Sequence, residues 1–501
     1  MKINKISIKI ACFFVTIAAI SLSSCAEDLM ELNENPNAIA NLPIGLQLTQ
    51  VQLNAAGQQY EMRRVALGWG ASSIQQLADV NIATNLLPGD KYIDFIDYSY
   101  AVYDQYFVNE VKDLIDYVTR TSEDPEAANY NAIGRIMKVI SFHKVTDLYG
   151  DIPYSEAGQG YLSNNWFPAY DSQKDIYANM LSELEAAASQ LNAAAENPGA
   201  QDIIYNGDLI KWRKLSYSMM LRLGLRMSKV DPSASESWVK KAIAGGVMTD
   251  LNDLAKIEHE VGGVENPFGY SFELDKFMRL SDTFVSWMQD NGDPRLEVLS
   301  WVESGAPHQG LPNGLDPTTL ISQGPVGGDL LDYSQVNPSL VKKDSPSMLI
   351  TYAEVELMLA EAAIRGWHTG NAATHYNNGV RAAMANWGFY GVDTPATADV
   401  DAYLSANPFV EANGLEMIGE QYWAATFLNP WEGYSNWRRV EFPVLTPVNY
   451  TGNATGGTIP RRMKYPLVEF TVNEEHVKAA VSRLVPGENT YTSRIWWDVK
   501  N

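Results

Sequence analysis

The apolar residues of this chain recur mainly at three- and four-residue steps, which is the spacing of one face of an α-helix. Residues 105–120 are typical, with Phe107, Val111, Leu114 and Val118 on one face. The same pattern predicts helices over five further ranges: 129–149, 173–192, 209–229, 350–365 and 371–386. We therefore predict a mainly α protein.

The clearest unit is a predicted pair of helices over residues 352–386. A turn around Gly366 to Gly370 separates them, and the small residues Ala360 and Ala372 allow close approach while Tyr376 fills the space beside them. This pair resembles a tetratricopeptide hairpin, although it lacks the full consensus. The pattern predicts a tetratricopeptide-like scaffold of helical hairpins, mainly over 105–246 and 350–386.

Two long stretches rich in Gly, Pro and Asn, residues 259–345 and 387–465, interrupt the helical pattern. They are too long for simple connections and contain too many aromatic residues for disorder. We predict that they form an irregular, loop-rich lobe with a few short strands and helices. Loops held by a rigid scaffold are common places for ligand sites.

The N-terminal residues have the pattern of a secretory signal peptide. Three lysines and no acid within residues 1–9 precede an apolar run over 10–20, and that run is shorter than the roughly twenty residues that span a bilayer. Leu22-Ser23-Ser24-Cys25 resembles a lipobox. We predict that residues 1–24 are removed and that Cys25 carries lipid, palmitate included, at the first mature position.

The other cysteine, Cys12, lies in the part predicted to be removed, which excludes a disulfide and a cysteine-bound zinc site in the mature chain. Glu27 and Asp28 directly after Cys25 resemble the acidic export signal of Bacteroidetes lipoproteins. That resemblance implies a lipid-anchored protein in the outer membrane, facing the cell exterior. Several acyl chains together hold such a protein stably, whereas one binds only marginally.

Composition narrows the classes of ligand. The formal net charge of −23 disfavours nucleic acid and anionic lipid headgroups. Thirteen tryptophans and twenty-six tyrosines supply rings that stack on sugars and hydrogen-bond at a wet interface. The alternative for each of these rings is packing in a helical core.

The chain lacks the usual catalytic and nucleotide-binding motifs. No G-x-S-x-G, P-loop, G-x-G-x-x-G or H-E-x-x-H sequence occurs. The nearest histidines, His368 and His375, straddle a predicted helix start, where packing or exposure explains them. We therefore predict no catalytic residues, no metal site and no cofactor. Acids are too abundant for a pair of carboxylates to be informative, so an exported α/α-toroid glycoside hydrolase remains an alternative.

Several segments resemble, in order, motifs of the SusD/RagB family of nutrient-binding outer-membrane lipoproteins, and specifically its starch-binding, outer-membrane-associating branch. They are LNENPNAI (32–39), DLYGDIPYSEA (147–157), the Tyr-Asp element at 170–171 with the helix DIYANMLSELEAA (175–187), KWRKLSYSMMLRLGLRMS (211–228), TYAEVELMLAEAAIRGW (351–367), NPWEGYSNWRRVEFPVL (429–445), IPRRMKYP (459–466) and SRIWWD (493–498). The resemblance implies that residues 25–501 form one SusD-like domain.

The resemblance also implies a function and a partner. The protein would capture an oligosaccharide outside the cell and deliver it to a SusC-like, TonB-dependent transporter over which it sits as a hinged lid, without catalysis. Peptide capture, as in RagB-like members, is the alternative within the family.

Family ligand sites lie on loops after the early helices and in the middle of the chain. By position, that implies Trp69, Tyr92 and Tyr98 as ligand-binding candidates, with Trp301 as a second wall. Core packing is the alternative for each of these rings.

The motifs also contain side chains for which we predict structural roles. Four arginines are expected mainly to form internal ion pairs: Arg438, Arg439, Arg461 and Arg462. Trp496 and Trp497 are expected to close the core. These motifs therefore identify the fold more than the binding site.

Overall fold

The computed structural model describes residues 42–81 and 87–500. The predicted signal peptide, Cys25 and the LNENPNAI segment lie outside the described residues. Residues Ile44–Asn501 form one compact unit, and this unit is described below.

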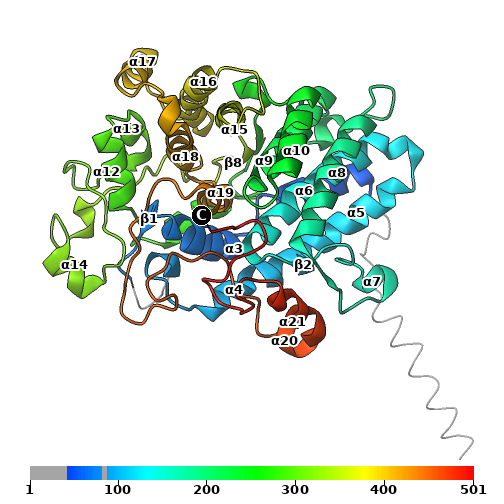
Figure 1. Ribbon diagram of the computed structural model, residues 1–501, viewed down its shortest axis with the longest axis horizontal. Coiled ribbons are helices and arrows are strands. Elements are labelled where there is room, and N and C mark those ends of the chain that lie inside the picture. Colours follow the sequence, from blue (N-terminus) through cyan, green and yellow to red (C-terminus); the bar gives the residue numbers. More distant parts are fainter. Residues whose placement is uncertain (1–41, 82–86, 501) are drawn as a thin grey trace, which may run out of the picture. The chain divides into compact units, whose positions relative to one another are not determined.

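The unit is mainly helical, as the apolar pattern predicts (Figure 1). Its α-helices are α2 (Ile44–Asn54), α3 (Gln59–Glu61), α4 (Ile96–Val102), α5 (Lys112–Ser122), α6 (Ala128–Tyr149), α7 (Gly160–Ser163), α8 (Gln173–Gln190), α9 (Leu209–Arg226), α10 (Pro232–Gly245), α11 (Pro267–Leu274), α12 (Asp282–Asp290), α13 (Arg295–Leu299), α14 (Pro317–Gln323), α15 (Tyr352–Ile364), α16 (Ala372–Ala385), α17 (Thr397–Ala406), α18 (Gly414–Ala425), α19 (Pro430–Val440), α20 (Glu469–Val472) and α21 (Glu474–Ser482).

The predicted helix over 105–120 is split into two kinds of helix. A π-helix, η3 (Tyr103–Val111), leads directly into α5. A second π-helix, η1 (Met62–Ala71), follows α3, and short 3₁₀ turns include η2 (Pro88–Asp90). The other five predicted helices correspond to α6, α8, α9, α15 and α16 within a few residues.

Helix ends follow from local chemistry. Ser172, Asp208 and Asn371 cap the N-termini of α8, α9 and α16 with their side-chain oxygens. Helix α6 ends at Tyr149, because Gly150 adopts a φ of 90°. Pro153 follows three residues later. The glycine therefore ends the helix in a tight turn.

Consecutive helices pack as an array of hairpins. Along the chain, α5 packs on α6, α6 on α8, α8 on α9, and α9 on α10 (Figure 1). Helix α15 packs against α9, α16 and α18, and α18 packs against α19. The α15–α16 hairpin is closely packed, since Gly379 of α16 lies against Leu357 of α15. The tetratricopeptide-like scaffold is thereby confirmed.

The described residues also contain four short antiparallel strand pairs, and three of their strands, β5, β6 and β7, lie in the loop-rich stretch 259–345. The pairs are β1 (Leu77–Ala78) with β5 (Arg279–Leu280), β2 (Ile152–Pro153) with β3 (Tyr170–Asp171), β4 (Ala255–Ile257) with β8 (Ser347–Ile350), and β6 (Ser300–Trp301) with β7 (Gln335–Val336). Residues 387–465 are more helical than the sequence indicates, because α17, α18 and α19 lie there and α18 packs directly on α15.

Buried ion pairs join these helices in the interior. Arg222 of α9 binds Glu354 of α15 at 2.5 Å, and Arg226 binds Glu432 of α19 at 2.6 Å. Asp147 of α6 lies 3.4 Å from Arg226. All five side chains come from the motif segments, so the motifs fix how the helices meet.

The four motif arginines are buried but divide into two kinds. Arg439 pairs with Glu361 at 2.6 Å and Arg461 with Asp498 at 2.5 Å, as predicted. Arg438 and Arg462 instead donate to backbone carbonyl oxygens and lie over aromatic rings. Trp497 is fully buried, as predicted, and Trp496 is half-buried.

Candidate functional site

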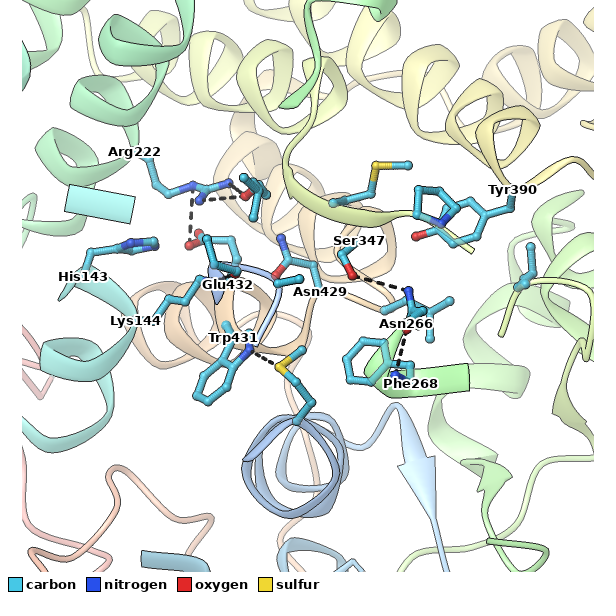
Figure 2. A pocket seen from close by; sticks show the side chains of 18 residues that line it. His143, Lys144, Arg222, Asn266, Phe268, Ser347, Tyr390, Asn429, Trp431 and Glu432 are labelled. Carbon is cyan, nitrogen blue, oxygen red and sulfur yellow. Dashed lines mark hydrogen bonds and ion pairs between the residues drawn. The ribbon is translucent and has the colours of Figure 1, made fainter. Parts of the chain in front are cut away.

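An enclosed cavity lies where α6, α9 and α19 meet β8 (Figure 2). Arg222 and Glu432 line one side of it and Asn266, Phe268 and Ser347 the other. The cavity has room for about 30 Å³, close to the volume of one water molecule in the liquid. A monosaccharide is several times larger, so this cavity is an interior polar gap and not a ligand pocket.

The charges beside this cavity already satisfy one another. Glu432 lies 3.5 Å from Arg222 and 2.6 Å from Arg226, and its other oxygen accepts a hydrogen bond from Tyr422. Burial raises the pKa of the Glu354 carboxyl, an effect that Arg222 opposes. Each of these two carboxylates therefore already has a cationic partner within the interior.

Exposed aromatic rings indicate where a sugar could stack. Among the described side chains, large exposed aromatic residues fall in two places. Trp166 and Phe167 follow α7, whereas Tyr270, Phe277 and Trp301 all belong to the loop-rich stretch 259–345. The second group lies where the sequence places an irregular lobe.

Strand pairing fixes the position of Trp301. Trp301 on β6 is directly opposite Gln335 on β7, so the two side chains share one face of the pair. The Trp301 ring is 42% exposed, and the Gln335 amide donates to Glu303 at 3.1 Å. An open indole face beside an amide and a carboxylate suits a carbohydrate, which presents both C–H faces and hydroxyl groups.

A groove begins at Gln335 and continues along α11. It holds about 520 Å³ and is lined by charged side chains such as Lys276, Lys343 and Asp344 and by apolar ones such as Phe272 and Val341. Tyr270 lies at its edge, with its ring centroid 5.6 Å from Lys343 Nζ. We use the name β7 groove for this hollow, lined by Gln335, Lys276 and Lys343 among others, together with Trp301 opposite Gln335 and Tyr270 beside Lys343. Its volume falls in the range of small-molecule sites.

Two other surface hollows are less suited to a sugar. A cleft of about 1030 Å³ between α13 and α17 has Tyr403 as its aromatic lining residue, and that ring is buried. A hollow of about 470 Å³ beside α7 and α20 contains Trp166 but is walled by the exposed apolar residues Val108, Val468 and Val472. Polar side chains such as Lys112, Gln159 and Asn165 also line it, but its wall is more apolar than that of the β7 groove.

Comparison with known proteins identifies the family. A family model described as "Starch-binding associating with outer membrane" matches residues 36–466. The chain belongs to the SusD-like family. Members of this family are binding proteins rather than enzymes. The family description indicates association with the outer membrane, and no helix within the described ranges is long and apolar enough to cross a membrane.

Solved structures agree with the assignment of this SusD-like protein. A chitin-binding protein is 34% identical, with a TM-score of 0.84 over 91% of this chain and 100% of the other. A SusD homologue from Bacteroides uniformis is 23% identical, with a TM-score of 0.79 over 92% and 100%. A chitin-binding SusD homologue from Flavobacterium johnsoniae is 24% identical, with a TM-score of 0.77 over 91% and 98%. No curated protein matches the chain.

The four predicted ligand residues of this SusD-like protein do not form one surface. Trp69 on η1, Tyr92 after η2 and Tyr98 on α4 come from elements in mutual contact, but their exposed fractions are only 1%, 1% and 3%. Burial raises the pKa of Tyr92 to about 12. These positions fit the alternative of core packing, and ligand contact by these three residues stays a prediction. Trp301 alone of the four has an exposed ring.

Sequence reasoning missed Trp166, which is 66% exposed. A signal for it was present, because Asn164-Asn165-Trp166-Phe167-Pro168 places two large aromatics in a polar turn with no helical period. Tyr270 and Phe277 were also missed, since their neighbours on either side belong to short elements without a clear pattern.

Proposed function

We propose that this SusD-like protein captures oligosaccharides, with chitin fragments as the first ligand class. The observation that carries this proposal is the 34% identity to a chitin-binding protein over 91% of the chain. Chitin chains are uncharged, and an acidic protein with a net charge of −23 does not repel them.

The β7 groove is the proposed capture site. Trp301 supplies the stacking face, and Gln335, Lys276 and Lys343 supply donors for hydroxyl and acetamide oxygens. The strands hold the indole in place, because β7 lies between β6 and β5, and β5 pairs with β1 beside the core. A platform already fixed before binding loses little conformational entropy when the sugar arrives.

We further propose that lipid on Cys25 anchors the protein to the outer membrane with its groove facing the exterior, and that it serves as the lid of a SusC-like, TonB-dependent transporter. Family membership and the lipobox support this arrangement. Peptide capture and glycoside hydrolysis are the competing functions, and the tests below distinguish them from oligosaccharide capture.

The capture site is tested by calorimetry with a chitin hexasaccharide on protein that lacks residues 1–25. We expect Trp301→Ala to weaken binding about tenfold or more, because truncating an aromatic anchor of a binding surface costs about 2 kcal/mol and about 1.4 kcal/mol is already tenfold. Gln335→Ala should weaken binding by a smaller factor. Trp166→Ala is the matched control, since it removes an even more exposed indole outside the groove.

Unchanged affinity in Trp301→Ala, or an equal loss in Trp166→Ala, contradicts the β7 groove as the site. Binding of a peptide library without binding of chitin or starch oligosaccharides contradicts carbohydrate capture. Release of shorter sugars from the hexasaccharide would identify a glycoside hydrolase instead.

A further inference from the structure

Two histidines face each other at the tip of the α15–α16 hairpin. His368 lies in the turn after α15, and His375 lies in the first turn of α16. Their Nε2 atoms are 3.1 Å apart, and their rings are tilted by 50°. Both side chains are partly exposed, so an ion from solvent can reach them.

A carboxylate fixes the orientation of one ring. His375 Nδ1 lies 2.7 Å from Glu356, and Tyr352 donates to the other oxygen of Glu356 at 2.7 Å. A proton on Nδ1 therefore points at Glu356, which leaves the lone pair of His375 Nε2 directed at His368. A carboxylate behind a histidine in this manner is the usual outer partner of a metal-bound imidazole.

Gly370 lies beside the two Nε2 atoms. A Cβ at this position would collide with Nε2 of both His368 and His375. The backbone of Gly370 is not in the left-handed region, so its conformation does not require glycine. The missing side chain instead leaves the space in which the two rings converge.

We propose that His368 and His375 form a binding site for a transition-metal dication such as zinc. Two imidazole nitrogens bound to one tetrahedral zinc ion at 2.0–2.1 Å lie about 3.3–3.4 Å apart, close to the 3.1 Å observed. Two further positions would be filled by water, because no cluster of three or more His, Cys, Asp or Glu suited to a metal occurs among the described residues.

The ligand set selects the metal. Imidazole nitrogens suit zinc, copper and nickel, whereas calcium and magnesium require several oxygen ligands.

A bound ion would join the two helices at their turn. Because the metal binds the folded hairpin, its binding free energy adds to the stability of the fold by mass action. The site lies on the α15–α16 hairpin, and none of the residues that line the β7 groove belongs to that hairpin. The metal site therefore adds to the capture function and does not depend on it.

The test is a zinc titration of the purified mature protein, with a chromophoric chelator as competitor. We expect one equivalent of zinc to bind, His368→Ala and His375→Ala to abolish that site, and Glu356→Gln to weaken it by about 10–100-fold. Gly370→Ala should also weaken it, although both histidines remain. His476→Ala is the control, because this histidine contacts Asn473 away from the pair.

Folding of each variant is checked by circular dichroism, and zinc is also located by anomalous diffraction from soaked crystals of the unaltered protein. A peak beside both Nε2 atoms, with a zinc-dependent rise in Tm that His368→Ala lacks, supports the proposal. A peak elsewhere, or equal zinc affinity in the histidine variants and the unaltered protein, overturns it.

Discussion

Glu361 of α15 holds together two parts of the chain that are distant in sequence. Both of its oxygens accept from Arg439 of α19, at 2.6 and 2.7 Å, and Arg365 donates at 2.8 Å. Burial alone would raise the pKa of this carboxyl, but the two guanidinium groups outweigh it and hold the pKa at about 2. The pair is bidentate and fully buried, a geometry in which ion pairs contribute most.

We expect Glu361→Gln to lower the free energy of unfolding by about 3–5 kcal/mol at pH 7, because Arg439 then stays buried without its counter-charge. Since the folded pKa lies below the ordinary value of 4.5, this stabilisation is complete above pH 4.5 and is lost as pH falls toward 2. Denaturant unfolding at several pH values measures the difference.

The matched control is Glu236→Gln, which alters an exposed carboxylate paired with Lys240 and should change stability little. A difference between the unaltered protein and Glu361→Gln that stays constant from pH 7 to pH 2 contradicts the role assigned to this pair.

At the scale of elements, glycines set how closely helices pack in two hairpins. A Cβ on Gly379 of α16 would lie 2.7 Å from Leu357 Cγ and 3.2 Å from its backbone nitrogen in α15. A Cβ on Gly224 of α9 would lie 3.2 Å from Val239 Cγ2, 3.4 Å from the Val239 backbone nitrogen and 3.5 Å from Trp238 Cβ in α10. The first contact is far inside van der Waals distance at two Leu357 carbons, whereas the second is tight at one methyl carbon and ordinary at the backbone.

In the interior of a helix, alanine is favoured over glycine by about 1 kcal/mol of free energy. The net effect of each substitution therefore depends on how much the clash of the new Cβ costs. We expect Gly379→Ala to lower the unfolding free energy by about 1–2 kcal/mol through overpacking. Gly224→Ala should be neutral or stabilising. Thermal and denaturant unfolding measure the unfolding free energy of both variants. Equal changes in the two variants would contradict the difference in packing that we infer.

Sequence periodicity predicts long helices well but not their internal form. Residues 129–149 correspond to α6 because many apolar residues repeat at helical steps. The π-helix η3 was not predictable from 105–120, since one wider turn hardly alters the apolar repeat. Strands of two residues, such as β6 and β7, are too short to have a period at all.

At the scale of the whole molecule, the motifs predict the fold better than the site. Asp147, Arg222, Glu354 and Glu432 come from recognisable segments and meet in the interior. Surface rings such as Trp301 and Trp166 have no required partner, so nothing in the surrounding sequence marks their exposure. Position along the chain suggested Trp301 together with three rings that the structure buries.

Anchoring is a property of the complete chain. We expect Cys25→Ala to abolish membrane retention and copurification with a TonB-dependent transporter from mildly solubilised membranes, because no other thiol is available for lipid in the mature chain. Cys12→Ala is the matched control and should have no effect, since it alters the segment predicted to be removed. Fractionation and immunoblotting measure both, and normal retention of Cys25→Ala contradicts the anchor.

Trp497 donates from its indole nitrogen to Asp147 at 2.9 Å, across 350 residues of sequence. Arg226, Tyr177 and Trp497 all surround that one carboxylate. A chain that emerges with its N-terminus first therefore supplies Tyr177 and Arg226 to Asp147 early, but supplies the third partner, Trp497, only when nearly the whole chain has passed. The hydrogen bonding of this buried carboxylate is therefore completed only by the C-terminal residues of the chain.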